Sequence, residues 1–207
     1  MASAIIHLAV AKELAKKLTI TDPYDYYLGS ISPDLAKQVG RTKEESHFIK
    51  NTYYDVPNIE LFIQKYPKFR FNDFNLGYFI HLYTDKLWIE EYLNNYMFNS
   101  SLKLLDGTIM QTTKEEMKQL LYSDYTNLNI QLIEDYDLDL SLFYEEFREP
   151  KTDIDEIPVN ELDILINKMG ILIENSKQEK TYLLDIFSIK QFIENTVDEI
   201  EKELRKI

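Results

Sequence analysis

The sequence predicts an all-α protein, and three observations lead to that prediction. Apolar residues recur at helical spacing through most of the chain, beginning with residues 4–18. Several of these stretches follow capping residues of the Ser/Thr-x-x-Glu/Gln type, which mark helix starts. We find no hairpin signal, no strict strand-like alternation and no internal repeat. The chain is therefore expected to fold as helices packed on one another.

In the first half, the first helix is expected over residues 4–18, with His7 as the only polar residue on its apolar face. Ser32 can cap a short helix that has Pro33 at its first position. Asp34 lies in the first turn of that helix, where the helix dipole favours a carboxylate. The other helices expected in this half lie at residues 24–28, near 43–47 after a capping box at 42–45, and at 57–66 and 72–98.

The second half also shows helical signals throughout. The helices expected there cover residues 112–135, 138–147, 160–175 and 188–206, with a polar connector at 148–158. A capping box at residues 112–115 opens the first of them. Its buried face is expected to carry Leu121, Tyr125, Leu128 and Leu132. Because no linker rich in Gly, Ser or Pro interrupts the chain, residues 1–207 are expected to form a single domain.

The composition favours a soluble, cytoplasmic globular protein. Of the 207 residues, 44% are hydrophobic and 29% are charged, as in ordinary globular domains. The chain has no cysteine, which excludes disulfides, thiolate metal sites and a cysteine nucleophile. The N-terminal segment lacks the basic region of a signal peptide, and no apolar run approaches the ~20 residues of a transmembrane helix. A cytoplasmic location is therefore expected.

The charge of the chain is strongly negative but unevenly distributed. The net charge is −13. Residues 1–98 hold 11 Lys and Arg against 12 Asp and Glu, whereas residues 99–207 hold 12 against 24. No dense basic patch is present, so bulk binding to nucleic acid or to an anionic membrane is not expected. The acidic half is typical of a solvated helical surface.

Two polar residues stand within the apolar and aromatic segment 76–88. His81 and Asp85 are four residues apart, which places their side chains on one face of a helix, one turn from each other. A buried polar pair needs partners. The pair is either a core histidine hydrogen-bonded to a carboxylate, or two ligands of one metal ion. The pair by itself leaves both interpretations open.

Three more residues of the metal-ligand type lie in the same half: His7, Asp34 and His47. In a helical bundle, all five can converge on one site. Nitrogen and carboxylate oxygen without sulfur suit zinc, and also manganese or iron. Competing classes lack their motifs, since the chain has no adjacent His-Asp pair, no paired Glu-x-x-His motifs, no Gly-x-Ser-x-Gly elbow and no phosphate-binding glycine-rich loop.

Four segments, taken in chain order, resemble the zinc-dependent phospholipase C family, which is related in fold to the S1/P1-type nucleases. They are His7-Leu8-Ala9, Tyr27-Leu28-Gly29-Ser30-Ile31-Ser32-Pro33-Asp34, Ser46-His47-Phe48 and Gly77-Tyr78-Phe79-Ile80-His81-Leu82-Tyr83-Thr84-Asp85. The resemblance covers residues 1–90. It implies a helical bundle of the phospholipase C/P1 nuclease type that holds zinc ions between its helices and uses them to hydrolyse phosphodiesters.

The resemblance also implies a role for each of the five residues. Asp34, His47, His81 and Asp85 would bind one zinc ion, and His7 would bind a second one that Asp85 bridges. Asp34 is the implied catalytic residue, which orients the attacking water or takes its proton. The implied partner is a small phosphoester or a phospholipid head group.

The chain departs from the family after the His-x-x-x-Asp helix, where family enzymes carry two more histidines and a glutamate. No histidine follows His81. Glu90, Glu91 and Asp124 are acidic residues in a position to substitute, but nothing in the sequence selects among them. Two functions therefore stay open. The chain is either a metal-dependent phosphoester hydrolase or a non-catalytic helical binding protein that retains the scaffold and a partial metal site.

Overall fold

The computed structural model describes residues 1–50, 56–93, 97–98 and 101–207, and this part of the chain is mostly helical, as predicted. The α-helices are α1 (Ala4–Ala15), α2 (Pro23–Gly29), α3 (Leu35–Gln38), α4 (Lys43–Ser46), α5 (Ile59–Lys65), α6 (Asp73–Leu87), α7 (Lys114–Asp135), α8 (Leu162–Glu174) and α9 (Ile186–Lys206). Short 3-10 helices lie at Ser32–Asp34, Phe69–Phe71, Ser141–Phe143 and Val159–Glu161.

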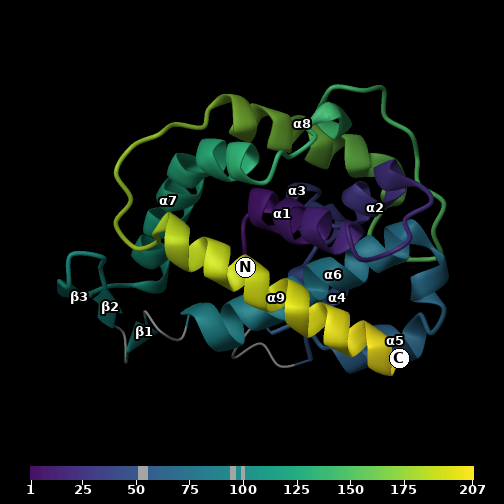
Figure 1. Cartoon of the computed structure of the whole chain (residues 1–207), viewed down its shortest axis with the longest axis horizontal. Helices are drawn as coiled ribbons and strands as arrows, with labels where there is room; N and C mark the ends of the chain where they lie inside the picture. Colours follow the sequence, from purple (N-terminus) through teal and green to yellow (C-terminus); the bar gives the residue numbers. More distant parts are fainter. Residues whose placement is uncertain (51–55, 94–96, 99–100) are drawn as a thin grey trace.

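Helix α1 lies in the middle of the molecule. It is in contact with α6, α7 and α9, and in Figure 1 these helices surround it. Residues on every side of α1 are buried, from Ile5 to Leu14. Helix α9 packs against α1, runs below it in the view of Figure 1, and turns an apolar face inward, with Ile189, Ile193 and Ile200 buried at helical spacing. The buried apolar residues of both halves of the chain form one continuous core.

Helices α2 and α6 touch through their backbones at two glycines. A Cβ atom on Gly29 would lie 2.1 Å from the carbonyl oxygen of Phe74, and one on Gly77 would lie 2.1 Å from that of Tyr26. Any larger residue would therefore push the two helices apart. This close crossing brings the segment after α2, with Ser30 and Asp34, against the middle of α6.

The helix expected over residues 72–98 is shorter than predicted. The α-helix ends at Leu87 and is followed by one turn of π-helix, Trp88–Tyr92, in which the two aromatic rings stack at 4.4 Å. Residues 97 and 98 belong to a strand. The prediction for residues 94–96 falls outside the described residues.

A small antiparallel sheet follows α6, where the sequence was expected to stay helical, and that prediction was wrong. The sheet has the order β1-β2-β3, with strands β1 (Met97–Phe98), β2 (Ser101–Lys103) and β3 (Ile109–Gln111). The turn of the second hairpin contains Asp106 and Gly107, and Gly107 has a φ of 86°. The Asp106 carboxylate accepts from the Thr108 amide at 2.9 Å. This Asp-Gly pair is a strong hairpin signal that the sequence analysis overlooked.

Several predicted helix boundaries also differ from the structure. Helix α1 ends at Ala15 rather than at residue 18, and Thr42 makes no capping hydrogen bond to α4. The capping box of α7 is formed by Thr113 and Glu116, one residue later than predicted. The helix expected at 138–147 is reduced to Ser141–Phe143, where Asp139 accepts from the Ser141 amide. Helix α8 starts at Leu162 rather than at residue 160, and α9 starts at Ile186, capped by Asp185, rather than at residue 188.

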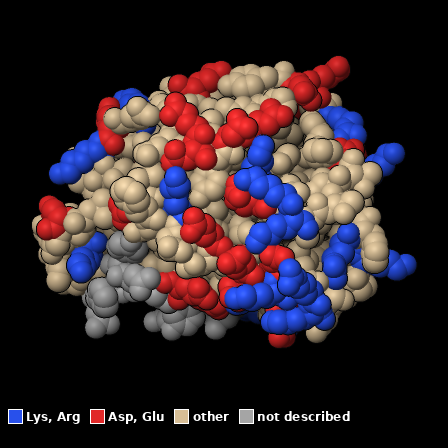
Figure 2. All heavy atoms as spheres, viewed as in Figure 1, with Lys and Arg blue, Asp and Glu red and all other residues tan. Residues whose placement is uncertain are grey.

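The predicted buried face of α7 is confirmed, because Leu121, Tyr125, Leu128 and Leu132 are all buried. Within the described residues, no helix has the length and apolar character needed to cross a membrane. Figure 2 shows acidic side chains gathered along the upper part of the visible face, with basic side chains interspersed among them and clustered toward the C-terminus of α9.

Candidate metal centre

Helix α6 carries the two residues that the sequence analysis singled out first. His81 and Asp85 lie one turn apart, as predicted, and both are completely buried. The distance from His81 Nε2 to Asp85 Oδ2 is 3.7 Å, which is too long for a hydrogen bond. The interpretation as a hydrogen-bonded core pair is therefore not supported by this geometry.

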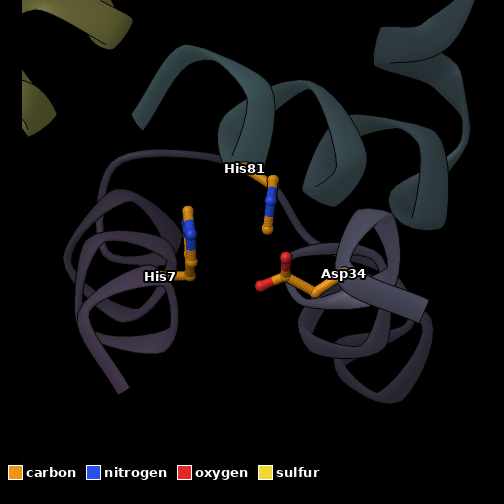
Figure 3. Close-up of side chains that lie close together, drawn as sticks. All are labelled: His7, Asp34 and His81. Carbon is orange, nitrogen blue, oxygen red and sulfur yellow. The ribbon is translucent and has the colours of Figure 1, made fainter. Parts of the chain in front are cut away.

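The other three ligand-type residues converge on this pair from separate elements. His7 lies on α1, Asp34 ends the 3-10 helix after α2, and His47 follows α4. His7 Nε2 is 3.4 Å from Asp85 Oδ1, and His47 Nε2 is 3.5 Å from Asp85 Oδ2. Figure 3 shows His7, Asp34 and His81 pointing into one common space. All five residues named from the sequence thus lie together.

The distances within the cluster match those between the ligands of one small cation. Four atoms arranged tetrahedrally at about 2.0–2.1 Å from a zinc ion lie about 3.3–3.4 Å from one another. His47 Nε2 and His81 Nε2 are 3.3 Å apart, and Asp85 Oδ2 lies 3.5 Å from the first and 3.7 Å from the second. These three atoms form one face of a slightly expanded tetrahedron.

A second set of ligand-type atoms shares His81 with the first set. His7, Asp34 and His81 each offer a ligand atom, and these atoms lie within 4.8 Å of one another. The rings of His7 and His81 stack at 3.8 Å. Asp85 directs Oδ1 toward His7 and Oδ2 toward His47, so one carboxylate faces both sets.

Hydrogen bonds outside the cluster determine which ring nitrogen of His81 faces inward without a proton. His81 Nδ1 lies 2.9 Å from the carbonyl oxygen of Ser30. Because a carbonyl can only accept, Nδ1 must carry the proton, and Nε2 presents a lone pair to the cluster. His47 Nδ1 is similarly paired with Ser46 Oγ at 2.8 Å. Backing of this kind orients metal-binding histidines.

Buried polar atoms of the cluster lack partners within the described structure. Both ring nitrogens of His7, Oδ1 of Asp34 and Oδ2 of Asp85 are buried without a hydrogen bond. Leaving a buried polar atom unsatisfied costs about 1–3 kcal/mol. Several such atoms around one point fit a cation, since nitrogen lone pairs and carboxylate oxygens are the ligands that zinc accepts.

The electrostatic environment keeps the ligand atoms in the form that binds a cation. Burial lowers the pKa of His47 and lowers that of His81 well below its usual value, so both rings are neutral at pH 7. Burial alone would raise the pKa of Asp85, but the neighbouring His47 and His7 outweigh it and hold that pKa well below its usual range. The neutral imidazoles of His47 and His81 thus lie beside an ionised carboxylate.

Asp34 marks the most open side of the cluster. Its side chain is 14% exposed, while those of the other four residues are fully buried. Burial would raise its pKa, but the Lys37 ammonium and the nearby His81 lower that pKa to about 2. Lys37 Nζ lies 3.6 Å from Asp34 Oδ1. Lys43, on α4, also faces this side, and burial together with the charge of Lys37 lowers its pKa to about 8.

The sequence analysis missed the residues that support the cluster. The Ser30 carbonyl, the Ser46 hydroxyl and the Ala2 amide, which donates to Asp85 Oδ1 at 2.8 Å, each fix one ligand. The Tyr78 hydroxyl donates to the Ser46 carbonyl at 2.6 Å and thereby positions the segment of His47. Ser30 and Ser46 stand inside the recognised segments, but a backbone acceptor leaves no signal in a sequence.

The acidic residues considered as replacements for the family's later ligands do not join the cluster. Glu90, Glu91 and Asp124 are absent from both groups of ligand-type atoms found in the described residues. Asp124 is buried and its carboxylate accepts the amides of Tyr182, Leu183 and Leu184 at 2.6–3.1 Å. It is a structural acceptor that holds the segment before α9.

Comparison with known proteins identified no relative of this chain. No family model matches the chain, and neither the curated proteins nor the solved structures include a match. The inference of function therefore depends on the residues of the cluster and their geometry.

Proposed function

We propose that this chain is a metal-dependent phosphoester hydrolase that resembles zinc-dependent phospholipase C in its site and fold. The observation that carries the proposal is the approach of His47 Nε2 and His81 Nε2 to 3.3 Å, beside the partnerless Oδ2 of Asp85. His81 Nε2 presents a lone pair, and in the tautomer in which His47 Nδ1 donates to Ser46 Oγ, His47 Nε2 presents one as well, so that the two lone pairs repel. A cation between them turns that repulsion into attraction, and the backing of His81 by Ser30 holds the ring in place for it.

The donor set supports zinc as the metal, with manganese or iron as further options. The two oxygens of Asp85 face different histidines, which supports two metal positions bridged by this carboxylate. Bound zinc would supply a Lewis acid and a water of lowered pKa. The chain's own contribution is a rigid, largely dry set of ligands, four of them completely buried.

Asp34 is the proposed catalytic residue. It is the only one of the five cluster residues with an exposed edge, and its buried Oδ1 has no hydrogen-bond partner among the described residues. As an ionised carboxylate it accepts a hydrogen bond from an incoming water and aims the water oxygen at phosphorus. In the reaction, the water oxygen bonds to phosphorus, the bond from phosphorus to the ester oxygen breaks, and the proton that the water loses goes to the departing alkoxide.

The first test is elemental analysis of the protein purified without added metal and again after zinc reconstitution. The proposal expects stoichiometric metal, lost in His81→Ala together with thermal stability, because a ligand that binds only the folded state stabilises it. Protein that holds no metal in either preparation would refute it. Hydrolysis of bis(p-nitrophenyl) phosphate or p-nitrophenyl phosphate that disappears in metal-replete Asp34→Asn would support the assigned role of Asp34.

A second candidate is a non-catalytic helical binding protein in which the metal is structural. The burial of four of the five residues favours it, since Asp34 alone among the five has an exposed edge. This candidate expects full metal content without turnover of either phosphoester. Turnover that depends on Asp34 would exclude it.

A further inference from the structure

Two lysines stand at the open side of the candidate metal centre. Lys37 lies on α3, with its side chain 36% exposed and its Nζ 3.6 Å from Asp34 Oδ1. Lys43 lies on α4, is half-buried, and its Nζ contacts the sulfur of Met1. The two ammonium groups are neighbours and repel each other. The chain as a whole has a net charge of −13, so two neighbouring lysines at this site contrast with the rest of the molecule.

The carboxylates that balance these lysines are the ones needed by a metal. Asp34 and Asp85 are the carboxylates that act on both ammonium groups, and Tyr122 also faces Lys37. Within the described part of the chain, Lys43 makes no ion pair with a carboxylate. Once both carboxylates bind cations, the exposed Lys37 and the half-buried Lys43 lose their anionic partners, and an anion that reaches this side of the cluster can take that place.

We infer that Lys37 and Lys43 bind the phosphoryl group of the substrate, and that the centre takes dianionic phosphate monoesters in preference to monoanionic diesters. The inference rests on the proposed function. A monoester carries a charge of about −1.5 to −2 at neutral pH, whereas a diester carries one negative charge. Two ammonium groups beside one opening match two negative charges. Charge-assisted hydrogen bonds from lysine to phosphate oxygens are also stronger than neutral ones.

The position of the lysines relative to Asp34 agrees with this role. Asp34 is the residue proposed to aim the water, and Lys37 is next to it. A phosphate held by Lys37 and Lys43 therefore lies against the same opening through which that water reaches phosphorus. The products would be an alcohol and inorganic phosphate, the second of which carries the same charges as the substrate group and should bind to the same lysines.

The test measures the binding of inorganic phosphate and of dimethyl phosphate to zinc-reconstituted protein by titration calorimetry. The variants are Lys37→Met, Lys43→Met and the double variant, and zinc content is measured for each. Methionine keeps much of the lysine stem without the charge. The matched control is Lys190→Met on α9, an exposed lysine paired with Asp135. We expect phosphate to bind more tightly than dimethyl phosphate, and each centre variant to weaken phosphate about ten-fold. The control should leave it unchanged.

Undiminished phosphate binding in a zinc-replete double variant would overturn the inference, and so would tighter binding of dimethyl phosphate than of phosphate. Turnover separates this inference from the proposed function. Lysine-dependent phosphate binding with no hydrolysis of either p-nitrophenyl ester would refute the hydrolase and leave the anion site standing. Hydrolysis combined with lysine-independent phosphate binding would do the reverse. In the active case, the double variant should lower kcat/KM for the monoester more than for the diester.

Discussion

Two carboxylates buried in different halves of the molecule show what burial alone does not reveal. Asp85 in α6 and Asp124 in α7 are both completely buried. Asp124 accepts three backbone amides, so its charge is balanced by the chain itself. Asp85 accepts one amide, from Ala2, and turns its second oxygen toward His47 and His81 without a hydrogen bond. Asp124 thus has a structural role that backbone amides satisfy, whereas Asp85 keeps one oxygen that lacks a hydrogen bond and is suited to bind a cation.

The largest expected effect on stability comes from the backbone contact between α2 and α6, the helix that carries Asp85. Gly77→Ala places a Cβ atom 2.1 Å from the Tyr26 carbonyl oxygen, so α2 and α6 must separate. We expect a loss of about 4 kcal/mol of unfolding free energy and of bound zinc. The control is Gly170→Ala in α8, where nothing lies within 4 Å and a gain of about 0.5–1 kcal/mol is expected. Urea denaturation measures both. Equal changes in unfolding free energy for the two variants would contradict the close backbone contact between α2 and α6.

Removal of the structural carboxylate should come next in size. Asp124→Ala leaves the amides of Tyr182, Leu183 and Leu184 without their acceptor. We expect a loss of about 3 kcal/mol of unfolding free energy with zinc content unchanged. Asp124→Asn, which keeps one acceptor oxygen, should lose less. A fall in zinc content in folded Asp124→Asn would show that Asp124 also affects zinc binding, which contradicts a purely structural role.

Zinc removal tests the other carboxylate. At a free zinc concentration 100 times its dissociation constant, bound metal stabilises the folded protein by about 2.7 kcal/mol. Chelation should remove this stabilisation from the wild type, whereas Asp85→Asn should show little change on chelation. The measurement is the unfolding free energy with zinc and with a chelator. A wild-type protein indifferent to chelation would contradict the cation interpretation of Asp85.

The pH dependence of the metal-free protein should reveal the buried histidines. Burial lowers the pKa of His47 and His81 in the folded state, so the unfolded chain binds protons that the folded one does not. Stability is therefore present above the unfolded pKa of about 6.5 and is lost as the pH falls below it, by up to about 1.4 kcal/mol per pH unit for each histidine. Chemical denaturation between pH 7.5 and pH 5, values that bracket about 6.5, measures the slope. A slope that does not decrease in His47→Gln would contradict this origin.

The smallest expected effect concerns a hydroxyl that contacts one of the histidine ligands and is not itself a proposed metal ligand. Ser46→Ala removes the partner of His47 Nδ1, which lies 2.8 Å from Ser46 Oγ. Outer partners of this kind contribute about ten-fold to metal affinity, or about 1.4 kcal/mol. Competition with a chromophoric zinc chelator measures the change. Ser141→Ala, at the exposed first residue of the 3-10 helix Ser141–Phe143 in the other half, is the control and should leave zinc affinity unchanged.

The sequence predicted those parts of the fold that local periodicity controls. The one-turn spacing of His81 and Asp85 and the buried face of α7 both follow from helix geometry, and the structure has both. The sheet after α6 was missed because its strands are only two or three residues long, too short for alternation to show. Its one local signal was the turn at Asp106 and Gly107.

The sequence pointed to the five residues that lie together in the structure, but not to their geometry. Asp34 and His47 lie on short elements whose positions depend on contacts between distant segments, which spacing does not encode. The lysines at the opening were also missed, because Lys37 and Lys43 look like ordinary helix-surface residues in the sequence. Only the folded arrangement shows that both face the side of Asp34.

The glycine contact between α2 and α6 has a kinetic consequence. Because the two backbones touch, the separation of the Ser30 carbonyl from the His81 ring is determined by main-chain packing, and it does not require a metal to establish it. The centre is thus preorganised, and the entropy of ordering these ligands is lost during folding and not during metal uptake. Zinc should therefore associate in a single fast phase, unlike the small zinc domains whose chains fold only when the metal arrives.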